Sequence, residues 1–293
     1  MTISGFMARA VGLAAFLVLS PLAAAQDAPQ VTKLTNHVYS VFWGFYNGLV
    51  VIGRDGVLVT DPANDNRAAV LKAEVEKLTD LPVTHIVLTH EHFDHIGGTD
   101  AFPDAVIVAQ DNIHAVLPLD PLDLAPDDID VTFDERHVID MQTTRVELRF
   151  FGAADGVAAT VVYLPQDGIA FTADLYEEAR FTPASFLEDT NMLGVRRILN
   201  EMGGWPLTHA VTAHSTGTDP AILKANIRYF NDLYDAVFPP IEAAAKSDNP
   251  FAMFDLVNTL PKSVTLDAYS DWDGYEHVPG HVRRMALAII HGG

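Results

Sequence analysis

The stretch His90-Glu91-His92-Phe93-Asp94-His95 places three histidines and two acidic residues within six consecutive positions. An apolar run, Val83–Leu88, precedes it and is typical of a buried strand, and Gly97-Gly98 follows it. The cluster is therefore expected at the carboxyl end of a strand, where the chain enters a loop and polar side chains converge in a cleft.

The spacing within this cluster indicates a metal site. His90 and His92 are two positions apart, so in an extended segment their side chains point to the same side. Asp94 and His95 lie beyond the turn and face a neighbouring point from a second direction. Imidazole and carboxylate groups are common ligands of Zn²⁺, and one segment is therefore expected to serve two metal ions.

The chain around the cluster reads as short strands followed by alternating strands and helices. Val38–Phe42, Gly48–Gly53 and Val57–Thr60 are apolar and β-branched, and the turn Arg54-Asp55-Gly56 joins the last two. These three strands are predicted to pair as a meander. Arg67–Leu78 has apolar residues at a helical spacing and predicts a helix.

Composition limits the possible partners. The chain has 293 residues, of which 49% are hydrophobic and 19% charged, a balance typical of a globular protein with a sizeable core. The formal net charge of −21 repels phosphate backbones and anionic lipid head groups. A nucleic acid or a membrane surface is therefore disfavoured as a partner, and a small-molecule substrate is expected.

The N-terminus predicts export. Val11–Leu19 is an apolar run too short to span a bilayer, and Leu22–Ala25 supplies small residues for cleavage after about Ala25. Residues 1–25 are interpreted as a signal peptide, and the mature chain, 26–293, is expected in the periplasm or secreted, with no membrane attachment. The chain contains no cysteine, so disulfides and thiolate ligands are excluded.

The segment Thr89–Gly98, THEHFDHIGG, resembles the H-x-H-x-D-H signature of the metallo-β-lactamase superfamily. Asn47–Pro62 is similar to the opening hairpin of that family, and Phe171–Leu175 and Ala210–Ser215 are similar to two later strands. The resemblance covers about Val31–Thr218. It implies an α/β fold of the αββα type, a four-layer sandwich in which two sheets pack face to face, helices lie outside, and the metal centre lies at one edge.

The resemblance also implies roles for single residues. Asp61 matches an aspartate that supports the ligands without binding metal, and Asp174 matches the aspartate that bridges the two metals. The implied second metal site consists of Asp94, His95 and His214. His90 and His92 belong to the first site.

The third ligand of the first site departs from the family pattern. The family usually places a histidine there, in a G-x-A-H-T segment before a strand that ends in V-V-Y-L-P. Counting back from Val161–Pro165 puts Asp155 in place of the histidine and Gly156 in place of the threonine. A carboxylate is still a ligand, so site one becomes His90, His92 and Asp155.

This replacement changes the charge of the centre. Two divalent ions carry four positive charges, which three aspartates and a bridging hydroxide would cancel, so a weaker Lewis acid is expected. The alternative interpretation is that Asp155 is a decayed ligand and that the centre holds one metal or none.

The remaining histidines are interpreted as core or surface residues. His85 precedes the motif on its own strand, and His209 lies shortly before His214; His114 and His137 flank a long insertion. His277 and His281 are four positions apart, but Pro279-Gly280 is expected to break the helix that would align them.

Two segments are expected to shape a substrate pocket. Asp111–Glu135 is too proline-rich for regular structure, and Tyr176–Leu193 mixes aromatic and acidic residues. The alternative is that both segments are plain acidic surface loops. From about residue 219 to 293 the chain predicts a helical extension, with a helix at Pro220–Val237, that packs on the sandwich within a single domain.

These features predict an exported metal-dependent hydrolase, in which a metal-bound hydroxide attacks a carbonyl group and Asp94 is catalytic because it orients the nucleophile. Zn²⁺, as one or two ions, is the expected cofactor, and Fe or Mn is compatible with the ligands. The sequence does not choose among β-lactam, lactone, thioester and other ester substrates.

Two alternative functions remain. The protein could be a non-haem iron oxygenase using His90, His92 and Asp155, or a non-catalytic metal-binding protein. The oligomeric state is not predicted.

Overall fold

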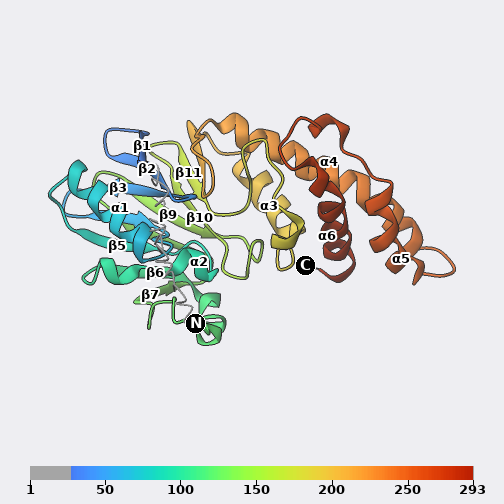
Figure 1. Cartoon of the computed structure of the whole chain (residues 1–293), viewed down its shortest axis with the longest axis horizontal. Coiled ribbons are helices and arrows are strands. Elements are labelled where there is room, and N and C mark those ends of the chain that lie inside the picture. The colour runs from blue at the N-terminus through green and yellow to red at the C-terminus, as the bar shows by residue number, and fades with distance from the viewer. Residues whose placement is uncertain (1–27, 293) are drawn as a thin grey trace, which may run out of the picture.

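Two β-sheets pack face to face, as the computed structural model of residues 28–292 shows (Figure 1). The expected signal peptide lies outside these described residues. Within them, seven strands form the first sheet, in the order β1 (Gln30–Lys33), β2 (Val38–Trp43), β3 (Tyr46–Ile52), β4 (Val57–Thr60), β5 (Val83–Val87), β6 (Val106–Gln110) and β7 (Val131–Phe133). Strands β1 to β4 are antiparallel, which confirms the predicted meander, and β4 to β7 are parallel.

The second sheet has five strands in the described chain. Their order is β12 (His209–Thr212), β11 (Ile169–Thr172), β10 (Thr160–Leu164), β9 (Arg145–Phe150) and β8 (Arg136–Asp140). Neighbours are antiparallel except β11 and β12, which run parallel and are connected through α3 (Met192–Met202). The carboxyl ends of β11 and β12 therefore lie side by side.

In the described part of the chain, three hydrophobic clusters lie between the layers. Leu58 and Val87 from the first sheet meet Val162 and Phe171 from the second, and all four are buried. Helix α1 (Asp65–Leu78) covers the outer face of the first sheet with residues that include Leu71. The outer face of the second sheet packs against α3 and the C-terminal helices. The predicted αββα sandwich is confirmed.

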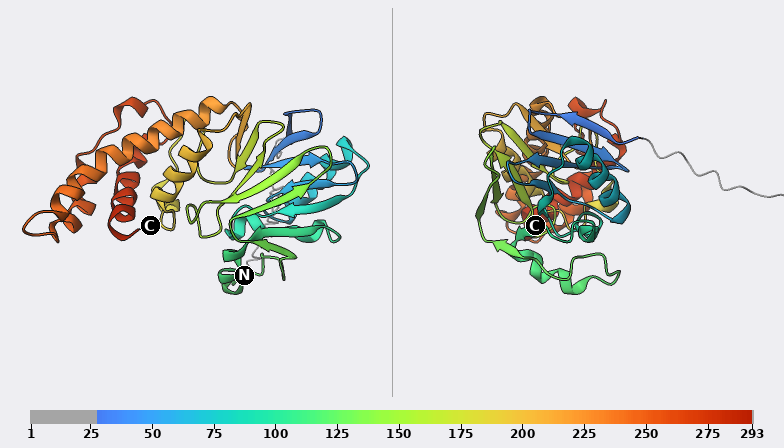
Figure 2. Two further views of the ribbon diagram at one scale, coloured as in Figure 1. Left: turned by 180° about the vertical axis from the view of Figure 1, so that it is seen from behind. Right: turned by 90° about the vertical axis from the view of Figure 1, so that its left-hand side faces the viewer.

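Helix α1 begins two residues earlier than the sequence pattern predicted, because Asn64 caps it. The Asn64 side chain accepts a hydrogen bond from the Arg67 amide at 3.1 Å. The C-terminal segment contributes α4 (Pro220–Ala245), α5 (Ala252–Thr259) and α6 (Val278–His291), which extend beyond the sandwich at one end (Figures 1 and 2). Short 3-10 turns complete the described chain at Thr99–Ala101, Asp111–Ala115, Leu117–Leu119, Ala184–Phe186, Leu260–Lys262, Asp267–Tyr269 and Tyr275–His277.

Two expectations about the C-terminal helices were wrong. Helix α4 continues through Pro239 and Pro240 to Ala245, because Val237 and Ile241 on either side of the prolines are both buried in the C-terminal cluster. Pro279 does not break a helix but lies in the first turn of α6, where a missing N–H costs no intrahelical hydrogen bond.

No helix between residues 28 and 292 combines the length and the apolar character that a membrane crossing requires.

Candidate metal centre

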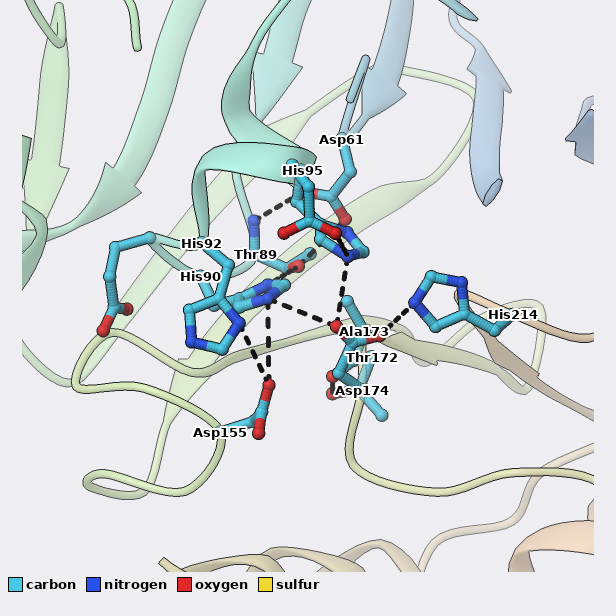
Figure 3. Close-up of polar contacts among 12 residues, drawn as sticks. Asp61, Thr89, His90, His92, His95, Asp155, Thr172, Ala173, Asp174 and His214 are labelled. Carbon is cyan, nitrogen blue, oxygen red and sulfur yellow. Dashed lines mark hydrogen bonds and ion pairs between the residues drawn. The ribbon is translucent and has the colours of Figure 1, made fainter. Parts of the chain in front are cut away.

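The histidine motif lies where the sequence pattern predicted. Strand β5 ends at Val87, the next residues are extended, and the short helix α2 (Phe93–Ile96) follows immediately. His90 and His92 come from the extended part and His95 from α2, so the imidazoles approach from two directions (Figure 3). His90 and His95 are almost completely buried.

A first group of donor atoms comprises His90, His92, Asp155 and Asp174, all within 4.8 Å of one another. His92 Nδ1 lies 3.3 Å from Asp155 Oδ2, and His90 Nε2 lies 3.5 Å from Asp174 Oδ2. This group contains the predicted first site, including the altered ligand position at Asp155.

A second group comprises His95, Asp174 and His214. Asp174 Oδ2 is 3.1 Å from His95 Nε2, and Asp174 Oδ1 is 2.9 Å from His214 Nε2. Asp174 follows β11 with a φ of +57°, a left-handed conformation that non-glycine residues rarely adopt. This backbone geometry places the Asp174 carboxylate between the two groups, as Figure 3 shows.

Asp94 lies at the rim of the second group. Its side chain is 61% exposed, and its Oδ2 lies 3.5 Å from His95 Nε2. The Tyr46 hydroxyl donates a hydrogen bond to the same oxygen at 3.4 Å. The structure thus brings Asp94 next to His95 but outside both groups of mutually close donors among the described residues.

Backbone geometry explains why glycine follows Asp155. Gly156 has a φ of +74°, and a Cβ atom there would collide with the carboxylate of Glu91. That carboxylate accepts hydrogen bonds from the amides of Val157 at 2.5 Å and Ala158 at 3.0 Å. Glu91, whose role the sequence analysis did not anticipate, therefore fixes the loop that presents Asp155.

Asp155 is also fixed from the opposite side. The Thr190 hydroxyl donates a hydrogen bond to Asp155 Oδ1 at 2.7 Å, which leaves Oδ2 facing His92. Burial, together with the nearby Asp174 carboxylate, raises the pKa of Asp155 to about 7. A cation between Asp155 and His92 would remove this electrostatic penalty.

Asp174 is a strongly stabilised carboxylate. Burial alone would raise its pKa, but His95, His214 and His90 outweigh burial and hold the pKa of Asp174 well below its usual range. Burial and the neighbouring His95 lower the pKa of His90 to about 4, so His90 is neutral and carries a free lone pair at neutral pH. A neutral imidazole beside an ionised carboxylate is a suitable donor pair for a divalent cation.

The buried nitrogens of the site fit metal ions. Among residues 28–292, His90 Nε2 and His95 Nε2 are buried nitrogens that face the Asp174 carboxylate without a hydrogen bond of good geometry. The Nδ1 atom of His214 lies 2.8 Å from the Phe45 carbonyl oxygen and must donate to it, so Nε2, which lies 2.9 Å from Asp174, is the nitrogen that a metal ion can bind once Nε2 has lost its proton. Nitrogen lone pairs and carboxylate oxygens converging in a buried site are the donors that Zn²⁺ and related ions require.

Asp61 supports the motif without joining either donor group. It accepts hydrogen bonds from the Thr89 amide at 2.8 Å and the Thr89 hydroxyl at 2.9 Å, directly before His90. Burial raises the pKa of Asp61 to about 6. The structure places Asp61 in the supporting position that the family resemblance implied.

The other eight histidines lie outside both donor groups of the described chain: His37, His85, His114, His137, His209, His277, His281 and His291. His281 lies in α6 and is buried. Its Nε2 lies 2.8 Å from the Thr182 carbonyl oxygen, and its Nδ1 lies 2.6 Å from the Tyr229 hydroxyl. A backbone carbonyl and a tyrosine, not a metal, occupy its two nitrogens.

A cavity of about 630 Å³ opens above the two groups. Leu122 and Leu124 from the proline-rich segment line it, together with Arg180 and Phe186 from the segment after Asp174. Both segments that the sequence analysis assigned to the pocket therefore contribute to its wall. Apolar side chains and a few polar groups around a concave site are typical of small-molecule binding.

A second residue that the sequence analysis missed is Asp189. Its Oδ2 lies 2.8 Å from His92 Nε2, on the side of the ring opposite Asp155. No local pattern distinguishes Asp189 from Glu188 beside it, because the contact spans 97 positions along the chain.

The αββα sandwich with paired histidine and aspartate donors at one edge is the architecture of a class of metal-dependent hydrolases. A sequence profile of the family described as the metallo-beta-lactamase superfamily matches residues 41–219, so the chain belongs to that superfamily.

Solved structures show the same fold. A metallo-beta-lactamase from Pontibacter korlensis is 21% identical, with a TM-score of 0.60 over 70% of this chain and 99% of the other. An Erythrobacter litoralis metallo-beta-lactamase, solved with beta-mercaptoethanol in its active site, is 20% identical, with a TM-score of 0.60 over 70% and 97% of the two chains. The metallo-beta-lactamase FIM-1 from Pseudomonas aeruginosa, in its mono-zinc form, is 20% identical, with a TM-score of 0.59 over 71% and 96%.

Proposed function

We propose that this protein is a zinc-dependent hydrolase that cleaves a small carbonyl compound, a β-lactam, lactone, thioester or other ester, with two ions bound at the paired donor groups. The observation that carries the proposal is the position of Asp174 at the cavity: its Oδ2 lies 3.5 Å from His90 Nε2 in the first donor group, and its Oδ1 lies 2.9 Å from His214 Nε2 in the second. A carboxylate shared between two donor groups is suited to a pair of ions.

The two donor groups supply most of the proposed ligands, and the family motif adds Asp94, which lies beside His95 but outside both groups. His90, His92 and Asp155 would bind the first ion, His95, His214 and Asp94 the second, and Asp174 both. When bound, such ions supply Lewis acidity, which polarises a carbonyl oxygen and acidifies water.

The chain's own residues position the reactants. Asp94, exposed at the rim beside His95, would orient the attacking water, and Tyr46 fixes the Asp94 carboxylate through its hydrogen bond. Leu122, Leu124 and Phe186 provide apolar surface that displaces water around the substrate.

The test combines metal analysis with activity. Protein purified without added metal is expected to contain two zinc ions per chain and to hydrolyse at least one of four probes, namely a chromogenic β-lactam, a γ-lactone, an acyl thioester and a nitrophenyl ester. Asp94→Asn is expected to keep the metal and to lose most of the rate. Zinc-loaded protein that hydrolyses none of the four probes would contradict the proposed activity.

A second function is favoured by one observation. His90, His92 and Asp155 form a set of two histidines and one carboxylate, which iron-dependent oxygenases use. One iron per chain together with substrate-dependent oxygen consumption would support that function in place of hydrolysis.

Export is proposed on the N-terminal sequence alone. Cell fractionation that finds a mature chain beginning near residue 26 in the periplasm or medium would support it, and a cytoplasmic full-length chain would contradict it.

A further inference from the structure

His92 lies between two carboxylates, one at each ring nitrogen. Asp189 Oδ2 is 2.8 Å from Nε2, and Asp155 Oδ2 is 3.3 Å from Nδ1. A neutral imidazole carries one proton, so it donates at one nitrogen and offers a lone pair at the other. The closer contact indicates that the proton lies on Nε2 and points to Asp189.

We infer that Asp189 is a positioning residue that fixes the tautomer and ring orientation of His92, so that the Nδ1 lone pair faces the first metal position. The inference rests on the proposed metal-dependent function. A carboxylate that accepts the distal N–H of a ligating histidine orients the ring and increases its basicity as a ligand. The family resemblance assigned no role to Asp189.

Asp189 lies in a segment that helix α6 binds at both ends. The segment that carries it runs from Thr182 to Thr190, and α6 binds the carbonyl oxygens at both of its ends. His281 Nε2 lies 2.8 Å from the Thr182 oxygen, and Arg284 Nε donates to the Thr190 oxygen at 2.5 Å.

The same segment reaches the first donor group twice. Thr190 donates to Asp155, and Asp189 faces His92, so two adjacent residues orient two of the proposed ligands. Helix α6 lies beyond residues 41–219, the part that matches the superfamily profile. The C-terminal extension thus contributes, through this segment, to the geometry of the first metal position.

The inference is tested by metal binding of the full-length chain, with Co²⁺ as the probe. The variants are Asp189→Ala, Asp189→Asn, His92→Ala as the reference for loss of the ligand, and Glu188→Ala as a matched control that removes the neighbouring carboxylate. Co²⁺ titrations followed by visible absorption report affinity and ligand geometry, and thermal unfolding of the metal-free proteins shows whether each variant folds.

Asp189→Ala is expected to weaken Co²⁺ binding at the first site by about 10- to 100-fold and to change its visible spectrum. Asp189→Asn keeps an oxygen acceptor and is expected to lose less affinity, whereas Glu188→Ala is expected to match the wild type. If Asp189→Ala binds Co²⁺ like the wild type while His92→Ala does not, the positioning role is wrong and the metal site stands. If His92→Ala also binds normally, both the proposed metal site and the positioning role are wrong.

Discussion

The hydroxyl of Thr190 donates a hydrogen bond to Asp155 at 2.7 Å, so the altered ligand position is joined to the segment that lines the cavity. Asp155 is thus not a solvent-exposed remnant. One oxygen is occupied by Thr190 and the other faces His92 and His90, an arrangement that fits a retained metal ligand better than a decayed one.

Replacing this aspartate tests the charge argument. Asp155→His is expected to add about one positive charge to the centre, because a neutral imidazole replaces a carboxylate. Bound water then loses its proton more readily, so hydrolysis near neutral pH should become faster and the pH of half-maximal rate should fall. Metal content must be measured together with the rate, because the substitution removes the hydrogen bond between Asp155 and Thr190 and puts a larger imidazole into a tightly packed site. Full metal content with an unchanged pH profile would refute the charge argument.

Gly156 offers a direct test of the loop beside Asp155. Gly156→Ala places a non-glycine residue in a left-handed conformation and brings its Cβ atom against the Glu91 carboxylate. Gly44 has a similar φ of +60°, but a Cβ atom there would meet open space. The backbone conformation alone costs roughly 1–2 kcal/mol. Urea unfolding should show a larger loss of stability for Gly156→Ala than for Gly44→Ala, and metal binding should weaken only in the former. Equal losses would show that the contact with Glu91 is unimportant.

His281 should make stability depend on pH. Burial lowers the pKa of His281 to about 4, whereas an unfolded histidine titrates near 6.5. Between these values the unfolded chain binds the additional proton, so stability is lost as pH falls from about 6.5 to about 4, by about 3 kcal/mol in total. Chemical unfolding across this range should show a shallower pH dependence for His281→Gln than for the wild type. The exposed His291→Gln serves as the control, and parallel curves for His281→Gln and the wild type would contradict the prediction.

Arg284 should influence the cavity without touching it. Arg284→Ala removes the hydrogen bond to the Thr190 carbonyl, whereas Arg283→Ala removes an adjacent exposed cation. The first variant is expected to speed amide exchange in residues 182–190, because a lost hydrogen bond to a charged donor destabilises that segment by about 1.5–3 kcal/mol, and to lower kcat/KM several-fold. Arg283→Ala should leave kcat/KM and the amide exchange rates unchanged. Similar effects from the two variants would point to net charge and not to the Thr190 contact.

The sequence was most informative where chemistry is local. The strand before His90 and the meander follow from hydrophobic periodicity, whereas the αββα class was implied by the family resemblance; the structure confirms all three. The convergence of Asp155 with His92 was predicted from the family spacing, and the structure places the two side chains together.

Contacts between distant segments were not predictable in the same way. Asp189 and Thr190 contact the donor groups from a segment that α6 helps to hold, and no spacing in the sequence encodes that position. The C-terminal end of α4 was misjudged because tertiary burial of Val237 and Ile241 overrides the local effect of Pro239. Glu91 was identified as part of the motif, but its role could not be predicted without knowing which backbone amides face its carboxylate.

The attachment of the Thr182–Thr190 segment to α6 at both ends also limits how such a protein can diversify. A loop joined to the body only through its own ends accepts insertions and deletions easily. Here an added or lost residue would displace either the Thr182 or the Thr190 carbonyl from its donor on α6. New substrate preferences in this lineage should therefore arise by exchanging side chains at a constant segment length.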